Sequence, residues 1–293
     1  MIEFDIFYGK EIENPKGVIQ VIHGMGEHCS RYIDLAEFFQ KKGYIVLGKN
    51  LKWHGPTHKL NGDLGLCDGR FQEVVEEQIE IGKEIKKLYP NLNLYILGHS
   101  MGSFVCQECL KRGYEGVTGY IIQGSSYHQP LLWKLGEILA NLLFKITGNT
   151  PSEFFKKIIF LGNNSRFKNE NDEFSWLTRD KLSRDRFRED EFCDFNYSMK
   201  FYKEFFLFLK NLYKEESFKD VPRDMRLLIV SGFEDPIGGY GDLVRKLYDF
   251  YKKLGFKNVD LHLIPMFRHE IHNEIDKEQY FEYLYNWLEK NKM

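Results

Sequence analysis

Four short runs of β-forming residues alternate with segments of helical character in the first half of the chain, and this alternation limits the fold more than any other feature. The runs are GVIQVIHG (17–24), GYIVLGKN (43–50), LNLYILG (92–98) and VTGYIIQG (117–124). Between the second and third runs, apolar residues recur near helical spacing until Pro90 ends the pattern. Strands separated by helices in this way form a mostly parallel sheet with helices on both faces. An α/β fold is therefore predicted.

The alternation stops after Gly124 and resumes about a hundred residues later. Residues 125–222 are predicted to form helices and loops, whereas MRLLIVSG (225–232) and NVDLHLIP (258–265) have the strand pattern again. We therefore predict that residues 1–124 and 223–293 form one α/β core, and that residues 125–222 are a helical cap inserted into it.

The charge and cysteine content of the chain exclude several classes of protein. Forty-one Lys and Arg against forty-three Asp and Glu give a net charge of -2, which provides no positive field for nucleic acid. Five scattered cysteines predict reduced thiols, and the pair Cys106 and Cys109 is interpreted as packing rather than a metal or redox site. The segment MIEFDIFYGK (1–10) has no secretory pattern, so a cytoplasmic location is expected.

The most apolar segment is PLLWKLGEILANLLFKI (130–146). Lys134, Glu137 and Lys145 interrupt it, and it is shorter than the roughly 20 residues of a membrane span. We expect a buried helix of the cap, with peripheral contact to a membrane surface as the alternative. Its apolar character also suggests a pocket for an acyl chain. The oligomeric state is left undetermined.

A serine lies at a sharp turn between the third run and the helical segment after it. Gly98-His99-Ser100-Met101-Gly102 fits the pattern G-x-S-x-G, in which a strained turn exposes the serine hydroxyl. A serine hydroxyl is a weak nucleophile unless a histidine accepts its proton and a carboxylate orients that histidine. The pattern therefore requires both partners elsewhere in the chain.

Two loops further along the chain supply candidates for these partners. The loop after the strand at 225–232 contains Glu234 and Asp235, and the loop after the strand at 258–265 contains His269 and His272. The order serine, acid, histidine is the one expected for a turn of this kind. The residues alone do not decide between Glu234 and Asp235, or between His269 and His272.

The proposed chemistry also needs amide groups that bind the negative charge formed on the substrate oxygen. One is the backbone N–H of Met101 at the start of the helix after Ser100. The second is expected from HGMGEH (23–28), the loop after the first parallel strand, where the N–H of Met25 is the natural donor.

Five stretches of the chain resemble those of a known group of enzymes. They are HGMGEHCSRY (23–32), GHSMGS (98–103), SGFEDPIGGYG (231–241), FRHEIHNE (267–274) and, in the predicted cap, LSRDR (182–186). These stretches resemble motifs of the α/β-hydrolases of the monoglyceride lipase and lysophospholipase branch, and the resemblance extends over nearly the whole chain. One stretch departs from that branch: residues 50–55 are Asn-Leu-Lys-Trp-His-Gly, where relatives have Asp-x-Arg-Gly-His-Gly. We expect a different loop shape there.

The resemblance implies an α/β-hydrolase fold and a role for each candidate. Ser100 would be the nucleophile, His269 the general base, Asp235 its orienting carboxylate, and the amides of Met25 and Met101 the oxyanion hole. No metal or organic cofactor is implied.

The expected reaction is hydrolysis of a carboxylic ester through an acyl-enzyme, with a monoacylglycerol or a lysophospholipid as the substrate. A short-chain carboxylesterase is one alternative. Another is an aminopeptidase or amidase, which would need a cap carboxylate for the substrate amine, with Glu137, Glu153 and Asp194 as candidates. A non-catalytic binding protein is disfavoured, because all three reacting side chains have candidates.

Overall fold

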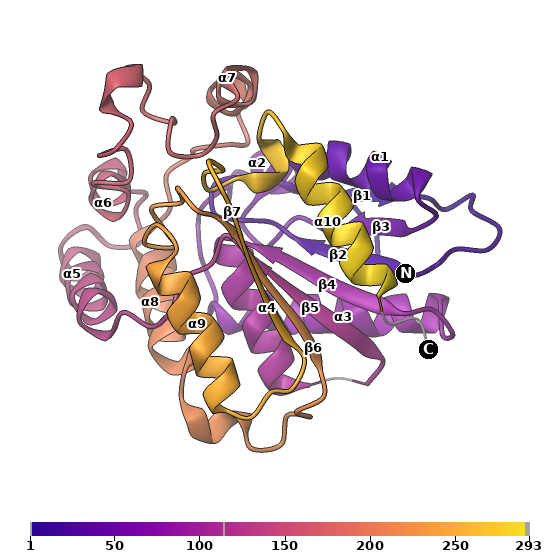
Figure 1. The fold of residues 1–293 in the computed structure, drawn as a ribbon. Coiled ribbons are helices and arrows are strands. Elements are labelled where there is room, and N and C mark those ends of the chain that lie inside the picture. The colour runs from indigo at the N-terminus through magenta and orange to yellow at the C-terminus, as the bar shows by residue number, and fades with distance from the viewer. Residues whose placement is uncertain (1, 114, 291–293) are drawn as a thin grey trace.

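A mostly parallel sheet forms the centre of the molecule. The structure, a computed structural model, describes residues 2–113 and 115–290. Its seven-stranded sheet has the order β1-β3-β2-β4-β5-β6-β7, with β1 antiparallel to β3 and every other pair parallel (Figure 1). The predicted α/β fold is confirmed. The strands are β1 (Ile6–Tyr8), β2 (Val18–Ile22), β3 (Ile45–Gly48), β4 (Leu94–His99), β5 (Val117–Gln123), β6 (Arg226–Gly232) and β7 (Val259–Ile264).

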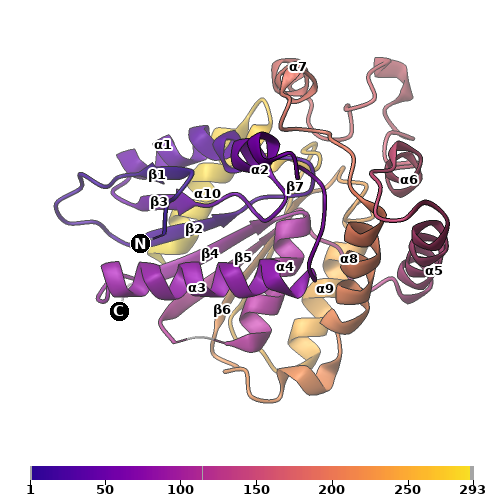
Figure 2. The same cartoon turned by 180° about the vertical axis from the view of Figure 1, so that it is seen from behind.

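Helices cover both faces of this sheet. Helices α1 and α10 lie on one face, and α3, α4 and α9 lie on the other (Figures 1 and 2). The helices are α1 (Ile33–Lys41), α2 (Gly55–Asn61), α3 (Gln72–Leu88), α4 (Met101–Arg112), α5 (Pro130–Thr147), α6 (Glu153–Ile159), α7 (Lys181–Glu189), α8 (Met199–Leu212), α9 (Asp242–Lys253) and α10 (Lys277–Glu289). Short 3-10 turns occur at Cys29–Tyr32, Lys168–Glu170, Glu215–Phe218 and Ile271–Asn273.

Strand β4 illustrates why the sheet is buried on both faces. Leu94 and Ile96 join the apolar cluster formed with α3, α4 and α9, whereas Tyr95 and Leu97 join the cluster formed with α1 and α10. Successive side chains of a strand point to opposite faces, so a strand with two covered faces is apolar at every position. This explains the continuous apolar run in the sequence.

Residues 125–222 contain α5, α6, α7 and α8 and contribute no strand to the sheet. Helix α8 joins this segment to the rest of the molecule, since Phe208 packs 4.8 Å from Phe71 and Phe205 lies 6.4 Å from Phe104 of α4. Helices α5 and α6 lie on the outer side of α8, away from the sheet (Figure 2). The division into a core and a cap stays a prediction.

Helix α5 differs from the expected buried helix. Trp133 and Ala140 are buried, and the helix packs along α8, but its opposite face is open to solvent. Among the described residues, no helix combines the length and apolarity that crossing a membrane requires. The exposed apolar side chains of α5 are Leu131, Leu132, Leu135, Ile138, Leu142 and Ile146.

Candidate active site

The turn between β4 and α4 presents Ser100 in a strained backbone conformation. Its φ is 51° and its ψ is -119°, a region that non-glycine residues rarely adopt. The flanking glycines make the turn possible, because a Cβ on Gly98 would lie 2.2 Å from the carbonyl oxygen of Gly102. A Cβ on Gly102 would lie 2.2 Å from the carbonyl oxygen of Ile22 on β2. The strand and the helix therefore approach one another more closely than any larger residue would allow.

The structure brings Ser100, His269 and Asp235 into contact, although they lie far apart in the sequence. The hydroxyl of Ser100 donates to Nε2 of His269 across 2.9 Å, and Nδ1–H of His269 donates to Oδ2 of Asp235 across 3.0 Å. The Asp235 carboxylate also accepts hydrogen bonds from the Ser231 hydroxyl and the Ile237 amide. Ser100 follows β4, Asp235 follows β6 and His269 follows β7, so parallel strands deliver all three to one edge of the sheet.

The other two candidates from the sequence lie elsewhere. His272 stacks on Tyr32, with ring centroids 4.3 Å apart, and its Nδ1 is 2.7 Å from the Gln123 side-chain amide. Glu234 makes a backbone hydrogen bond to Phe267, and its side chain has no contact with His269 among the hydrogen bonds of the described residues. Geometry therefore distinguishes Asp235 from Glu234 and His269 from His272, which sequence spacing did not.

The buried environment of His269 suits a proton acceptor. Burial alone would lower its pKa, but the charge of Asp235 and the hydrogen bond to it outweigh burial and leave the pKa raised. The neighbouring His99 has the opposite shift, since burial and the nearby His269 and His272 hold its pKa well below the ordinary value. His269 is thus the histidine of this cluster whose surroundings favour the protonated form.

The loop at 23–28 lies against Ser100. A Cβ on Gly24 would come within 3.2 Å of the Ser100 Cβ. The Gly24 amide donates to the buried carboxylate of Glu27, and the Gly26 amide donates to the hydroxyl of Tyr197 across 2.5 Å. No hydrogen bond of the Met25 amide is found among the described residues. The predicted donor is therefore unpaired, between two amides that are already used.

The loop at 50–55 packs against the inserted segment through Trp53, whose ring lies 6.2 Å from that of Phe201, and through His54, which contacts Tyr197. Trp53 has a φ of 66°, in the left-handed region that favours glycine, so its backbone is strained. Burial of its ring and a hydrogen bond from its indole N–H to Asp68 offset this strain. Asn50 still provides the hydrogen-bond acceptor that an aspartate would provide at this position, because its side-chain oxygen accepts from the Cys29 amide at 2.8 Å.

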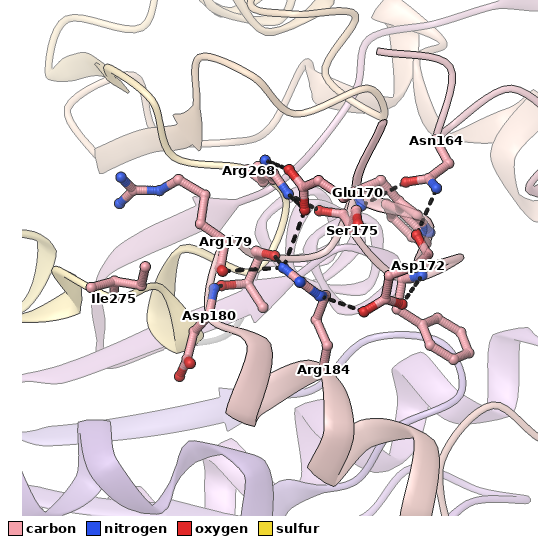
Figure 3. Close-up of polar contacts among 12 residues, drawn as sticks. Asn164, Glu170, Asp172, Ser175, Arg179, Asp180, Arg184, Arg268 and Ile275 are labelled. Carbon is pink, nitrogen blue, oxygen red and sulfur yellow. Dashed lines mark hydrogen bonds and ion pairs between the residues drawn. The ribbon is translucent and has the colours of Figure 1, made fainter. Parts of the chain in front are cut away.

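The inserted segment also holds the loop that contains His269. The guanidinium of Arg268 binds the Glu170 carboxylate and the Ser175 carbonyl oxygen, as Figure 3 shows. The His269 amide donates to the Trp176 carbonyl oxygen across 3.4 Å, and the two rings lie 5.1 Å apart. Sequence reasoning missed Trp176 and Arg268, because no local pattern identifies a contact between segments about ninety residues apart.

A cavity of about 830 Å³ opens over Ser100. Its floor includes Ser100, His269 and the loop at 24–27, and its walls come from residues 153–197 of the inserted segment, many of them aromatic. The apolar helix at 130–146 does not line this cavity, so the acyl pocket suggested there from the sequence stays a prediction. The apolar wall residues are Phe160, Leu161, Phe174, Trp176, Leu177, Phe187 and Phe195.

One group of side chains in the described chain has donor atoms close enough to hold a metal ion. His28, Asp190 and Cys193 offer donor atoms within 4.8 Å of one another. The 2.8 Å contact between His28 and Asp190 has the length of an ordinary hydrogen bond, and Cys193 packs in an apolar cluster with Phe187. We assign no metal to this group.

The parallel sheet, the serine at the turn between β4 and α4, and the acid and histidine loops after β6 and β7 define the class of α/β-hydrolases. The chain belongs to the family described as serine aminopeptidase, S33 (Hydrolase_4), whose model matches residues 13–276.

Curated relatives match over part of their length. The chain is 30% identical over 142 residues to a monoglyceride lipase homolog of Monkeypox virus, which is 48% of this chain and 50% of that protein. It is 33% identical over 98 residues to monoglyceride lipase of Rattus norvegicus, which is 33% of this chain and 31% of that protein. It is 32% identical over 111 residues to phospholipase YtpA of Bacillus subtilis, which is 38% of this chain and 40% of that protein. The chain thus spans half or less of the length of these relatives.

Solved structures match over almost the whole chain. A thermostable carboxyl esterase from Bacillus coagulans in complex with glycerol has a TM-score of 0.85 and 25% identity, over 96% of this chain and 93% of that one. A soluble variant of monoglyceride lipase from Saccharomyces cerevisiae shares the fold, with a TM-score of 0.73 and 21% identity over 97% and 90%. The named relatives are lipases and a phospholipase, and the solved structure at 25% identity is an esterase with the same fold.

Proposed function

We propose that the protein hydrolyses carboxylic esters of the monoacylglycerol or lysophospholipid type through an acyl-enzyme on Ser100. The observation that carries this proposal is the contact of Ser100 with His269, and of His269 with Asp235, at the floor of an aromatic-walled cavity. The names of the relatives support the lipid class of substrate.

The reaction follows from the geometry. His269 accepts the Ser100 proton at Nε2 while Oγ attacks the ester carbonyl carbon. The carbonyl oxygen becomes negative and is bound by the amides of Met25 and Met101. The alcohol leaves with the proton from His269. Water then gives its proton to His269 and attacks the acyl carbon, which releases the fatty acid and restores Ser100.

The cavity supports a substrate with an apolar chain. Its volume lies in the range of sites that enclose a drug-sized ligand, and its walls offer aromatic rings and leucines. Lys168 and Glu173 are also part of the lining and would face a polar head group.

A panel of p-nitrophenyl esters from acetate to palmitate tests this specificity. We expect kcat/KM to rise from acetate to decanoate or longer chains, because each buried methylene contributes about 0.8 kcal/mol. The Ser100→Ala variant is the control and is expected to have no measurable turnover. A preference for acetate would contradict the lipid assignment and favour the short-chain carboxylesterase.

The family description also raises the aminopeptidase alternative. Two candidate carboxylates, Glu153 and Asp194, are part of the cavity lining, but each is already paired with a lysine. Lys157 binds Glu153 at 2.7 Å, and Lys156 binds Asp194 at 2.9 Å. A neutralised carboxylate attracts a substrate amine weakly, so esters are favoured. Faster turnover of aminoacyl-naphthylamides than of esters would contradict this ranking.

We further propose reversible contact between α5 and an anionic lipid surface. The exposed leucines and isoleucines of α5 lie beside exposed Lys134 and Lys145, a combination that suits anionic headgroups. Phe154 and Leu161, at and beyond α6, are 64% and 82% exposed, and Leu161 also belongs to the cavity lining. Leu161 thus belongs both to the exposed apolar surface near α6 and to the cavity lining. The cytoplasmic location stays a prediction, and five free, buried cysteines agree with it.

A further inference from the structure

The loop that carries Met25 is held by a buried chain of hydrogen bonds that begins in the inserted segment. The Gly26 amide donates to the Tyr197 hydroxyl oxygen across 2.5 Å, and that hydroxyl lies 2.6 Å from Nε2 of His54. Nδ1 of His54 lies 2.8 Å from the carbonyl oxygen of Lys52. These hydrogen bonds therefore join three segments that are distant in sequence: the loop at 23–28, the loop at 50–55, and Tyr197, two residues before α8.

The chemistry of each group fixes the direction of every hydrogen bond in this chain. The Lys52 carbonyl oxygen can only accept, so Nδ1 of His54 carries the proton and Nε2 is an acceptor. The Tyr197 hydroxyl therefore donates to Nε2 and uses its oxygen to accept from Gly26. Burial lowers the pKa of His54 to about 4, which keeps the ring neutral at pH 7 and preserves that acceptor.

The inserted segment fixes Tyr197 itself. The Tyr197 carbonyl oxygen accepts from the Ser152 amide, and its ring stacks on Phe201 at 4.0 Å. The Asp194 amide donates to the Gly26 carbonyl oxygen across 3.0 Å. Both backbone groups of Gly26 are thus bound by a stretch of four residues, 194–197.

These contacts bear on the direction of the Met25 amide. Gly26 has a φ of 65°, a conformation from which glycine moves easily, so its position depends on these external contacts. Peptide units are planar, so fixing Gly26 on one side and Gly24, through Glu27, on the other restricts the intervening Met25 N–H. A donor to an oxyanion is effective only when it is aimed before the reaction.

On the proposed function, we infer that Tyr197 is a positioning residue for the oxyanion hole: its hydroxyl couples Gly26 to His54 and so orients the Met25 amide. Tyr197 acts through the loop and need not touch the reacting atoms. Its predicted contribution is to the transition state, where the oxyanion forms, more than to substrate binding.

The test compares Tyr197→Phe with Tyr202→Phe. Phenylalanine keeps the ring stack at position 197 but leaves the Gly26 amide and His54 Nε2 without a partner. Tyr202 is equally buried, and no hydrogen bond in the described chain joins its hydroxyl to the loop at 23–28 or to His54. Reactive sites are counted by complete fluorophosphonate labelling, so that kcat refers only to folded, reactive enzyme.

We expect Tyr197→Phe to lower kcat by about tenfold to a hundredfold with KM changed by less than about threefold, since losing one oxyanion donor completely costs about a hundredfold or more. The inhibition constant of an alkyl boronic acid, whose adduct places an oxyanion at the same position, should rise by a similar factor. The acid limb of the pH profile, set by His269, should not move. Values for Tyr197→Phe within about twofold of those for Tyr202→Phe would overturn the inference.

A second pair of variants changes His54, at the other end of this series of hydrogen bonds, and serves as the test if Tyr197→Phe does not fold. His54→Gln can keep an acceptor for the Tyr197 hydroxyl, whereas His54→Leu cannot. We expect His54→Gln to keep most of the per-site activity and His54→Leu to lose it, and equal activities would contradict the inference. Failure of the proposed function looks different: the unmodified protein would then show neither Ser100-dependent labelling nor ester hydrolysis.

Discussion

Asp235 is fully buried, and among its hydrogen-bond partners in the described residues His269 is the one that titrates, so its charge acts on the protonation of His269. His269 accepts the Ser100 proton only when it is neutral, and Asp235 raises its pKa above the ordinary value of 6.5. Activity should therefore be lost as the pH falls through that raised pKa. The carboxylate also holds the ring in the tautomer whose Nε2 faces Ser100.

The substitution Asp235→Asn tests both effects. We expect kcat to fall by about a thousandfold to ten-thousandfold, because the amide favours the wrong tautomer. The acid limb of the residual activity should move to lower pH, since removing the negative charge lowers the pKa of His269. Asp242→Asn, an exposed carboxylate on α9, is the matched control. An acid limb that stays in place in Asp235→Asn would contradict the assignment of His269.

Single residues also show which parts of the candidate site could be predicted from the sequence. The pattern around Ser100 identified the nucleophile candidate, because a strained turn needs small neighbours at fixed positions. Tyr197 was not identified as a functional residue, since its partners Gly26 and His54 are more than 140 residues away. A hydroxyl has no periodic signature, so its partner emerges only from the fold.

At the scale of elements, the positions of strands could be predicted from the sequence more reliably than the burial of each helix face. The parallel strands other than β7 are mainly apolar, β7 alternates apolar and polar residues, and the structure has a strand in each predicted run. Helix α5 is apolar over most of its circumference, with Lys134, Glu137, Asn141 and Lys145 along one side, and so wide an apolar surface normally indicates extensive burial. Packing on α8 buries only one of its faces, and nothing in the local sequence distinguishes the face that stays exposed.

The exposed face of α5 leads to a binding prediction. Leu135→Ser combined with Leu142→Ser should weaken binding to vesicles of phosphatidylglycerol and phosphatidylcholine by about tenfold or more, because each leucine can contribute about 1–2 kcal/mol on transfer to an apolar phase. Turnover of a water-soluble ester should not change. Leu60→Ser, at an 87% exposed leucine on α2, is the control and should bind normally.

Vesicle binding is measured by cosedimentation, with the oligomeric state of each variant checked by light scattering. Equal binding of the double variant and the Leu60→Ser control would contradict the lipid-surface proposal. A dimer of the unmodified protein that dissociates in the double variant would assign this face to a second copy of the chain instead.

At the scale of the whole molecule, the inserted segment and the sheet build the site together. Glu170 binds the residue before His269, and Asp194 and Tyr197 bind Gly26, so both loops that surround Ser100 depend on the insertion. An outward movement of residues 170–197 would disturb both loops. We therefore expect substrate to enter near Leu161, which is exposed and belongs to the cavity lining.

The central claim is that Ser100 becomes acylated during turnover, and trapping that intermediate tests it most directly. The protein is mixed with p-nitrophenyl decanoate, quenched in acid within milliseconds to seconds, digested and examined by mass spectrometry. We predict a decanoyl group on the peptide that contains Ser100, formed at the rate of the initial burst of nitrophenol and absent in Ser100→Ala. Ester turnover that persists in Ser100→Ala, or a decanoyl group on another residue instead, would contradict the account.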